Sequence, residues 1–258
     1  MNHARGDTMD MDAKEFKDEQ LIRTFDYVFD QSTLSAIRRL AAKKEFEQLE
    51  YVISTGKEAH VFRAVDHAGN YRAVKIYKTS ASTFHHMAPY MEGDKRFSNG
   101  KQDKRDLVFE WVKKEFKNLG LLQRAGIPAP IPNAYLENVL VMSLIMDADG
   151  NPAPSLQDVN PKTLDGEVIY QELVEMLSNL WYKAKLIHAD FSAFNLLFDG
   201  EHVVAIDVGQ AVTLSHPKAK IFLDRDLENT AKYAKRLGIN KTPEEVKEDV
   251  KAFHEKNR

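Results

Sequence analysis

We predict an α+β fold with two lobes for this chain of 258 residues. Two observations carry the prediction. Short segments rich in β-branched and aromatic residues, separated by turn residues, dominate the first half and indicate an antiparallel sheet. Stretches with apolar residues at helical spacing dominate the second half. We therefore expect an N-terminal lobe with a twisted antiparallel sheet and packed helices, followed by a mainly helical C-terminal lobe.

The composition is typical of a soluble domain. Hydrophobic residues make up 43% of the chain and charged residues 29%, which is enough apolar surface for a core. No run approaches the roughly 18 apolar residues of a membrane span, and the N-terminus lacks the apolar segment of a signal peptide. The absence of cysteine excludes disulfides and thiolate metal sites. The net charge of −3 gives no general attraction to DNA, and we expect a cytoplasmic protein.

The N-terminal region begins with a polar stretch. Residues 1–20 are predicted to be a flexible N-terminus. Between 21 and 49, apolar residues recur at a spacing that predicts two short helices. The segment Asp30-Gln31-Ser32 supplies the break between them and an N-cap for the second helix.

The sheet is expected within residues 50–145. Strands are predicted for the segments 50–54, 59–65, 71–78 and 139–145. Residues 79–106 are polar and lack a period, so we expect a flexible loop of a length that is usually functional or disordered. Its serines Ser80, Ser82 and Ser98 are candidates for self-phosphorylation. A helix is predicted for 107–123, where Glu115 interrupts an apolar stripe and therefore needs a partner.

The C-terminal lobe is expected to cover residues 146–258. One long apolar stripe predicts a helix over 169–184, and two further helices are predicted over 217–237 and 243–254. Between them, 196–198 and 203–206 read as a hairpin around the turn Asp199-Gly200.

The hairpin brings a set of oxygen-bearing side chains together. Asn195 enters its first strand and Asp207 leaves its second, so both side chains should lie at the same end. An amide and a carboxylate suit Mg²⁺ that also binds phosphates. Asp190 precedes Asn195 on an irregular loop and could orient an attacking hydroxyl. Each residue alone is as typical of a turn or cap, but the joint pattern indicates phosphoryl transfer from ATP.

Lys75 stands inside a β-prone segment. Strand alternation places it on one face with Ala73 and Tyr77, while Val74 and Ile76 point to the other. A lysine on a half-buried face needs an anion, and Glu115 and an ATP phosphate would both serve. The alternative is an exposed lysine on an edge strand.

The turn after the first strand carries further candidates for phosphate contacts. Ser54, Thr55, Gly56 and Lys57 offer hydroxyls, backbone N–H groups and a cation. The segment has neither the glycine spacing nor the following helix of a Walker A motif. The alternative is an ordinary hairpin turn.

Taken in order, these motifs resemble the RIO family of atypical serine/threonine protein kinases, in its first subfamily and archaeal form. The resemblance covers about 25–235. It is carried by Ser54-Thr55-Gly56-Lys57-Glu58-Ala59, Lys75, Lys114-Glu115-Phe116-Lys117-Asn118-Leu119, Pro152-Ala153-Pro154, the loop from His188 to Asn195, and Ile206-Asp207-Val208-Gly209-Gln210. Tyr90 and Gly93-Asp94-Lys95-Arg96-Phe97 also resemble that subfamily's flexible loop. The chain departs from the family pattern at Phe191-Ser192-Ala193-Phe194 and at Met146.

The resemblance implies a kinase-like fold, truncated relative to ordinary protein kinases, and a role for each matching position. Asp190 would be the catalytic aspartate, Asn195 and Asp207 the metal ligands, and Lys75 the phosphate-binding lysine paired with Glu115. The adenine would contact Met142 and the backbones of Ser143 and Ile145. Asp207 could itself accept phosphate, which would give an ATPase cycle. The implied cofactors are ATP and Mg²⁺, with Mn²⁺ as an alternative, and the implied partner is the pre-ribosomal small subunit during its maturation.

Two rival functions stay open. A small-molecule kinase of the aminoglycoside or choline type shares His188-x-Asp190-x-x-x-x-Asn195 and a later Ile-Asp, although little chain follows Asp207 for its acceptor subdomain. A non-catalytic ribosome assembly factor could use the nucleotide only as a switch. Residues 95–117 carry more Lys and Arg than Asp and Glu, which fits either a solvated helix face or a contact with rRNA.

Overall fold

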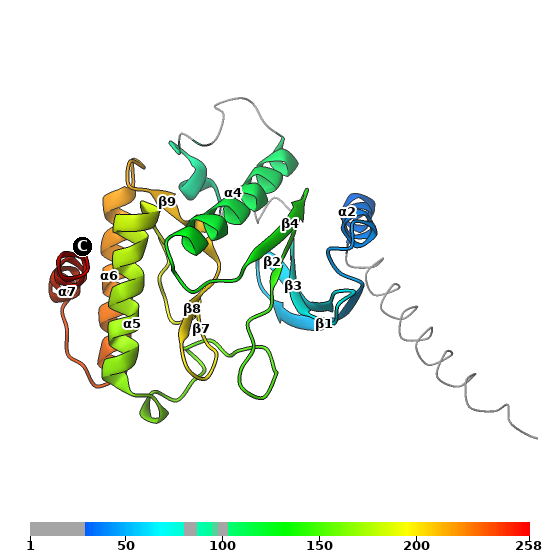
Figure 1. The fold of residues 1–258 in the computed structure, drawn as a ribbon. Coiled ribbons are helices and arrows are strands. Elements are labelled where there is room, and N and C mark those ends of the chain that lie inside the picture. Colours follow the sequence, from blue (N-terminus) through cyan, green and yellow to red (C-terminus); the bar gives the residue numbers. More distant parts are fainter. Residues whose placement is uncertain (1–28, 80–86, 95, 97–102) are drawn as a thin grey trace, which may run out of the picture.

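The computed structural model describes residues 29–79, 87–94, 96 and 103–258, and it divides them into a strand-rich lobe and a helical lobe (Figure 1). The predicted flexible N-terminus, the first of the two N-terminal helices, and the candidate sites Ser80, Ser82 and Ser98 lie outside the described residues. Within the predicted loop 79–106, residues 87–91 and 104–106 are helical, which corrects the expectation for these residues.

The N-terminal lobe is built on a five-stranded antiparallel sheet with the order β1-β2-β3-β5-β4. The strands are β1 Gln48–Thr55, β2 Ala59–Val65, β3 Tyr71–Tyr77, β4 Pro132–Leu136 and β5 Val139–Ser143. Four of them match predicted segments. β4 was not predicted, because a proline at its start is also typical of the residues that follow the end of a helix. Pro132 is tolerated there because β4 is an edge strand.

Helices cover both faces of this sheet. α2 (Gln31–Ala42) begins at Asp30, whose side chain accepts a hydrogen bond from the Thr33 N–H at 2.8 Å, as the predicted N-cap requires. Val74 and Ile76 pack in one apolar cluster with residues of α2. Ala73 and Tyr77 pack in another with residues of α4 (Lys104–Arg124). The predicted alternation along β3 is therefore confirmed, and both of its faces are buried.

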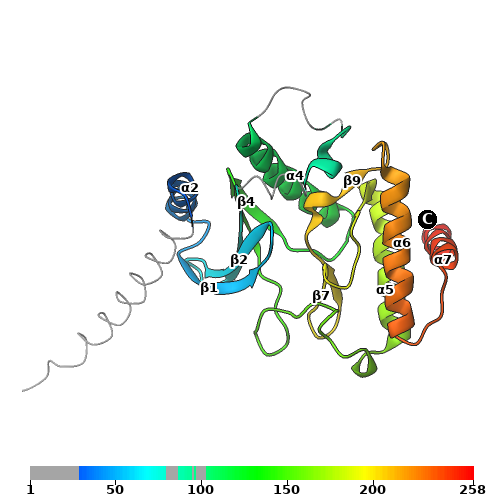
Figure 2. The same cartoon turned by 180° about the vertical axis from the view of Figure 1, so that it is seen from behind.

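The C-terminal lobe holds three main helices, α5 (Gly166–Asn179), α6 (Ala219–Arg236) and α7 (Pro243–Lys256). α5 and α6 run side by side in both ribbon views, while α7 packs against both and is seen nearly end-on (Figures 1 and 2). The helix predicted over 169–184 is present, but only its first part is the α-helix α5. Its last turn widens into a π-helix, η2 (Leu180–Ala184). Lys185 follows with φ 58°, a left-handed conformation that ends the helix before the loop from His188 to Asn195.

Short strands connect these helices to the site. The predicted hairpin is present as β7 (Leu196–Phe198) and β8 (Val203–Ala205). Two further strands, β6 (Leu186–Ile187) and β9 (Val212–Thr213), pair with each other on either side of it in the sequence. They were not predicted, because two residues are too few to show a period.

The largest apolar cluster runs from the sheet into the C-terminal lobe through α4. Val108 and Trp111 of α4 belong to the same cluster as Val208 and Ala211, which follow Asp207 in the C-terminal lobe. α4 therefore belongs to both lobes and fixes one against the other. No helix in the described part of the chain is long and apolar enough to cross a membrane.

Replacement of Leu177 by alanine tests this core. Leu177 of α5 is fully buried in the large cluster, so the cavity should lower the free energy of unfolding by about 2–5 kcal/mol. Val168→Ala on the same helix is the control, because Val168 is 51% exposed and its loss should change stability by less than about 0.5 kcal/mol. Urea denaturation measures both, and equal effects would contradict this assignment of the core.

Candidate active site

Lys75 lies at the centre of the site, on the face of β3 that points to α4. Its side chain is 9% exposed, and its Nζ atom lies 2.8 Å from Glu115 Oε1 and 2.9 Å from Asp207 Oδ1. The predicted pairing with Glu115 is confirmed. The contact with Asp207 adds an ion pair between the two lobes, since Lys75 belongs to the sheet and Asp207 follows β8.

Glu115 has partners for both carboxylate oxygens. Lys75 binds one oxygen, and the Tyr77 hydroxyl donates a hydrogen bond to the other. Tyr77 was not predicted as a site residue, although its position two residues after Lys75 on the same strand face was the available signal. The carboxylate that interrupts the stripe of α4 is thus paired and fully hydrogen-bonded, which is what a buried charge requires.

The three charges shift one another's pKa values. Burial lowers the pKa of Lys75, but Asp207 and Glu115 outweigh burial and hold it well above its usual value. Burial raises the pKa of Asp207, yet the Lys75 ammonium holds it below its usual value. For Glu115 burial prevails over Lys75, and its pKa is raised. Lys75 and Asp207 are therefore an ionised pair at neutral pH.

Asp207 occupies an unusual backbone conformation between β8 and the short 3-10 turn η3 (Val208–Gln210). Its φ of 57° and ψ of 55° lie in the left-handed region, which costs free energy for a residue with a side chain. Such conformations persist where the surroundings enforce them, often at functional sites. The side chain is 38% exposed, so Asp207 remains accessible although Lys75 is buried.

The β7–β8 hairpin brings Asn195 to the same end as Asp207, as predicted. Leu196 pairs with Ala205, and the Ile206 N–H donates to the Asn195 carbonyl at 3.0 Å. The Asn195 amide nitrogen donates to Asp190 Oδ2 at 2.9 Å. The same nitrogen also donates to the Asp190 carbonyl at 3.0 Å. Because the amide nitrogen faces Asp190, the amide oxygen of Asn195 is the atom that can bind a cation.

The backbone around Asp190 is held from behind by α6. Asp226 is fully buried and accepts hydrogen bonds from the Ala189 and Phe191 N–H groups, both at 2.9 Å. The Arg225 guanidinium donates to the Ala189 carbonyl. Neither residue was predicted. The signal that singled out Glu115, an acid on the apolar stripe of a helix, was present for Asp226 as well.

The residues expected to contact adenine lie at the end of β5 and just after it, in a segment that we call the hinge (residues 142–145). Met142 is buried opposite Ala73 of β3. The Ser143 N–H donates to the Ile131 carbonyl at 2.9 Å, and the Ile145 carbonyl accepts from the Ala153 N–H at 3.0 Å. The segment around Ala153 is thereby fixed to the hinge strand. The adenine contacts expected of Met142, Ser143 and Ile145 stay predictions.

The turn between β1 and β2 is exposed at Ser54, Thr55, Gly56 and Lys57. It is closed by a hydrogen bond from the Gly56 N–H to the Ala59 carbonyl at 2.9 Å. Ala59 pairs with Tyr77, so the turn lies at the end of β3 opposite the hinge. Its predicted contacts with phosphates are compatible with this position and stay a prediction.

The donor set suits Mg²⁺ bound together with phosphates. Among the described residues, no group of three or more His, Asp or Glu side chains could hold a metal ion. Asp207 supplies one carboxylate and Asn195 one amide oxygen. Mg²⁺ is commonly held by one or two carboxylates plus phosphates and waters, so the residues present fit the metal–nucleotide complex better than a metal alone.

Sequence comparison decides the family. The model of the RIO domain matches residues 60–247. The chain belongs to the RIO family. It is 43% identical over 232 residues to the RIO-type serine/threonine-protein kinase Rio1 of Haloferax volcanii, which covers 89% of this chain and 76% of the relative. The Rio1 of Thermoplasma acidophilum is 41% identical over 191 residues, covering 74% of this chain and 98% of the relative.

Longer relatives and a solved RIO structure agree with this family. The human serine/threonine-protein kinase RIO1 is 36% identical over 88% of this chain, which spans only 40% of that protein. The Rio2 kinase from Chaetomium thermophilum, solved as an ADP/Mg²⁺-phosphoaspartate complex, superposes with a TM-score of 0.63 at 26% identity, over 84% of this chain and 64% of that one. The predicted truncated kinase-like fold is confirmed, and family membership indicates protein kinase activity.

A double-mutant cycle tests the buried pair. Lys75→Met and Glu115→Gln each leave a buried charge with fewer partners, so each should lower the free energy of unfolding by about 3–5 kcal/mol. The double variant should cost clearly less than the sum, because the two residues interact directly. Urea denaturation gives the coupling.

The exposed pair Lys113–Glu110 on the same helix is the control for this cycle. Its nitrogen–oxygen distance is 3.1 Å, and its side chains are 38% and 32% exposed, so its coupling should be about 0.5 kcal/mol or less. Additive costs for Lys75 and Glu115 would contradict the pairing.

Proposed function

We propose that this RIO-family protein transfers the γ-phosphoryl group of ATP in a Mg²⁺-dependent reaction, and that it acts in maturation of the small ribosomal subunit. The ion pairs from Lys75 to Glu115 and to Asp207, next to the Asp190–Asn195 contact, are the observation that carries the enzymatic part. The acceptors considered are a serine or threonine of a protein, Asp207 itself, and water.

Each residue has a role in this proposal. Lys75 binds ATP phosphates and is oriented by Glu115, while Asn195 and Asp207 hold Mg²⁺. Asp190, half-buried and bonded to Asn195, accepts a hydrogen bond from the attacking hydroxyl. Bound Mg²⁺ supplies neutralisation of the phosphate charge. Met142, Ser143 and Ile145 line the adenine side, and Ser54, Thr55, Gly56 and Lys57 contact the phosphates from the β1–β2 turn.

Asp207 is the acceptor that this chain's own chemistry favours. Lys75 keeps its carboxylate ionised, and the side chain is 38% exposed. A carboxylate oxygen would bond to the γ-phosphorus as the bond to the ADP oxygen breaks, and water would then hydrolyse the acyl phosphate. The Rio2 kinase complex with ADP, Mg²⁺ and phosphoaspartate supports this route by similarity. The net reaction is ATP hydrolysis.

The family match affects the two rival functions differently. The RIO-domain match over residues 60–247 removes the ground for a small-molecule kinase of the aminoglycoside or choline type. A nucleotide-switched assembly factor remains distinguishable by experiment, since it would bind ATP without turning it over. Mg²⁺ is the metal in the complex of the Chaetomium thermophilum Rio2 kinase. Mn²⁺ is proposed only as a substitute for it.

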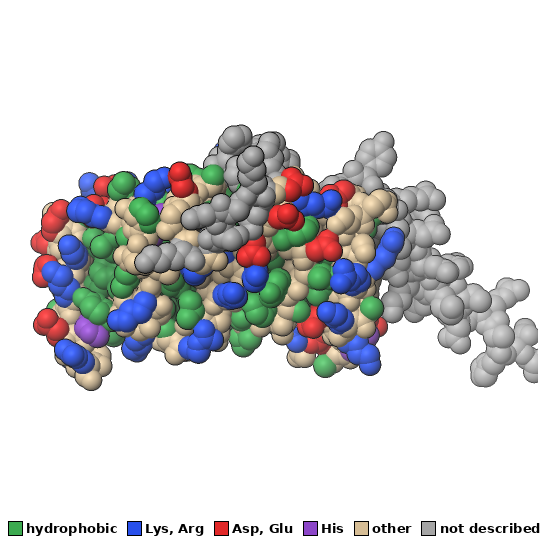
Figure 3. Space-filling model, turned by 90° about the horizontal axis from the view of Figure 1, so that it is seen from above, with side chains coloured by type: hydrophobic (Ala, Val, Ile, Leu, Met, Phe, Trp, Pro, Cys, Tyr) green, Lys and Arg blue, Asp and Glu red, His purple; other side chains and the backbone are tan. Residues whose placement is uncertain are grey.

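The ribosomal partner and a cytoplasmic location are both proposed from the resemblance to RIO kinases, not from a basic surface. Within the stretch 95–117, Arg96 bonds to the buried Asn118, Lys114 is buried, and Arg105 forms an ion pair with Asp30 at 3.1 Å. Lys and Arg side chains are interspersed with Asp and Glu on the face that Figure 3 displays. We therefore expect that protein contacts contribute to docking alongside any contact with rRNA.

Replacement of Asp207 by asparagine tests the metal site. Mg-ATP turnover should fall by more than about a hundredfold, because changes outside the ligand shell alone cost roughly 10- to 100-fold. Asn195→Ala should reduce turnover less and raise the Mg²⁺ requirement. Asp199→Asn is the matched control, since Asp199 lies in the β7–β8 turn and an Asn-Gly turn is equally favourable. Wild-type turnover by Asp207→Asn would remove Asp207 from the mechanism.

The chemical stability of the phosphoprotein identifies the acceptor. After incubation with labelled ATP and Mg²⁺, label on Asp207 should be lost in mild base and in hydroxylamine, since it is an acyl phosphate. Label on serine should survive hydroxylamine. Peptide mapping of the labelled chain distinguishes the two directly. Stable label on serine or threonine, with none on Asp207, would contradict the aspartyl route and leave protein kinase activity.

A further inference from the structure

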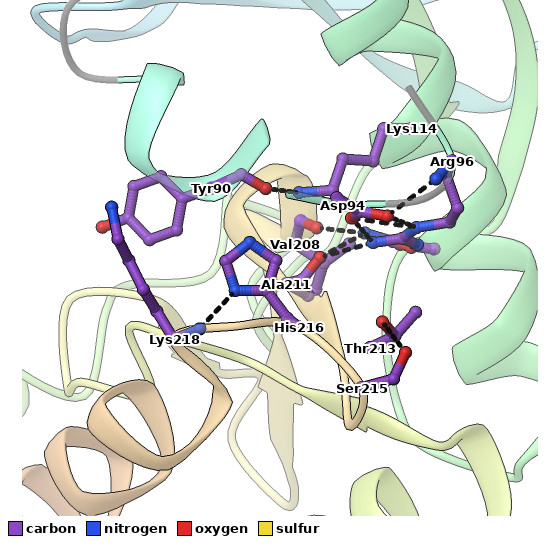
Figure 4. A network of polar contacts seen from close by, with 11 residues as sticks. Tyr90, Asp94, Arg96, Lys114, Val208, Ala211, Thr213, Ser215, His216 and Lys218 are labelled. Carbon is purple, nitrogen blue, oxygen red and sulfur yellow. Dashed lines mark hydrogen bonds and ion pairs between the residues drawn. The ribbon is translucent and has the colours of Figure 1, made fainter. Parts of the chain in front are cut away.

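The segment before α4 reaches back to the residues that follow Asp207 (Figure 4). Arg96 is the centre of this contact. Its Nη1 atom donates to Asn118 Oδ1 of α4 at 2.8 Å, and its Nη2 atom donates to the Ala211 carbonyl at 3.2 Å. The same guanidinium holds Asp94 through both carboxylate oxygens. One side chain thus joins three parts of the chain.

Asn118 transmits this contact to the turn that follows Asp207. Its amide nitrogen donates to the Val208 carbonyl at 2.8 Å and to the Ala211 carbonyl at 3.3 Å. Both are acceptors, so the NH₂ end of the amide must face them and its oxygen must face Arg96. Asn118 is fully buried. Without Arg96 the buried Asn118 oxygen would lose this donor, and only the two carbonyls would hold the amide in place.

A buried carboxylate makes Arg96 hard to replace. Asp94 has a side chain with 0% exposure, and Arg96 is its ion-pair partner at 2.6 Å. Lys114 is the other cation close to it, but burial and the nearby Arg96 charge lower the pKa of Lys114 to about 7. Above that pH, Arg96 is the main countercharge of Asp94. A forked guanidinium can serve Asp94, Asn118 and a carbonyl at once, whereas an ammonium cannot.

The N-terminal part of the segment docks on the C-terminal lobe. The Tyr90 ring stacks on Phe222 of α6 with a centroid distance of 5.1 Å, and its hydroxyl accepts from Arg225 at 3.1 Å. Gly93 has a φ of 82°, and a Cβ atom there would lie 2.6 Å from Pro217 Cγ. Only glycine therefore fits this approach, and it directs the following residues toward α4.

We propose that Arg96 is a positioning residue that fixes Asp207 for metal binding by orienting Asn118 against the turn of residues 208–211. The inference rests on the proposed function, in which Asp207 is a ligand of Mg²⁺. α4 then positions Asp207 through two contacts. Glu115 pairs with Lys75, which in turn pairs with Asp207, and Asn118 donates to the Val208 carbonyl in the turn that follows Asp207. The contacts of Arg96 with Asn118 and the Ala211 carbonyl thereby hold the metal site in place.

Trp111 provides a readout of this turn that needs no activity. A Cβ atom on Gly209 would lie 2.6 Å from Trp111 Nε1, so the indole packs directly against the turn. The chain has two tryptophans, and the other, Trp181, lies in η2 of the C-terminal lobe. The full chain labelled with 5-fluorotryptophan gives two ¹⁹F resonances, which Trp181→Phe assigns.

The experiment compares Arg96→Ala and Gly93→Ala with Arg63→Ala. Arg63 also forms an ion pair with a carboxylate, that of Glu50 at 2.7 Å, but it lies on β2 outside the site. Arg96→Ala and Gly93→Ala should move or broaden the Trp111 resonance and leave that of Trp181 unchanged. Both should raise the Mg²⁺ concentration needed for half-maximal ADP binding about tenfold, the size expected for a residue behind a metal ligand. Arg63→Ala should do neither.

An unchanged Mg²⁺ requirement in Arg96→Ala overturns the proposal, whatever the Trp111 resonance does. Should Arg96→Ala fail to fold, Arg96→Lys replaces it, with a raised Mg²⁺ requirement at unchanged thermal stability as support and wild-type behaviour as refutation. ADP binding without ATP turnover by the wild type would count against the proposed function alone. If the wild type does not bind ADP, the Trp111 resonance decides, and an unmoved resonance overturns the positioning role.

Discussion

The buried ammonium of Lys75 lies between a carboxylate of α4 and a carboxylate of the C-terminal lobe, at 2.8 Å and 2.9 Å. Burying the charges of Lys75 and Glu115 costs several kcal/mol for each ion unless they are paired with good geometry. That requirement constrains the register of β3, the rotation of α4 and the left-handed turn at Asp207 together, since a shift in one would leave a charge without its partner. The arrangement of the two lobes depends on this group of charges, and so does the ionised state of Asp207.

The sequence predicted the parts of the site whose signals are local. Strand alternation separated Lys75 from Val74, the acid on an apolar stripe identified Glu115, and the hairpin placed Asn195 and Asp207 at one end. Each of these follows from a period or a turn type that neighbouring residues determine. The same reasoning missed the edge strand β4. A proline at its start is compatible with the end of a helix and with the first residue of an edge strand, and the sequence does not show which strand pairs with it.

What the sequence could not predict depends on contacts between distant segments. Asp226 supports the loop around Asp190 only because α6 packs behind it. Arg96 reaches both Asn118 and Ala211 only because α4 packs against η3. Tyr77 was placed on the correct face but without its bond to Glu115. In each case the sequence shows the residue type, but the residue's partner lies far away in the sequence and is determined by tertiary packing.

The most direct test of the central claim is a crystal structure of the full chain with Mg²⁺ and a non-hydrolysable ATP analogue. We predict Mg²⁺ bonded to Asn195 Oδ1 and an Asp207 oxygen at roughly 2.0–2.1 Å, the distance of octahedral Mg²⁺. Lys75 should contact a phosphate oxygen while it keeps Glu115. Phosphates bound away from Lys75, or a metal that touches neither Asn195 nor Asp207, would contradict the account.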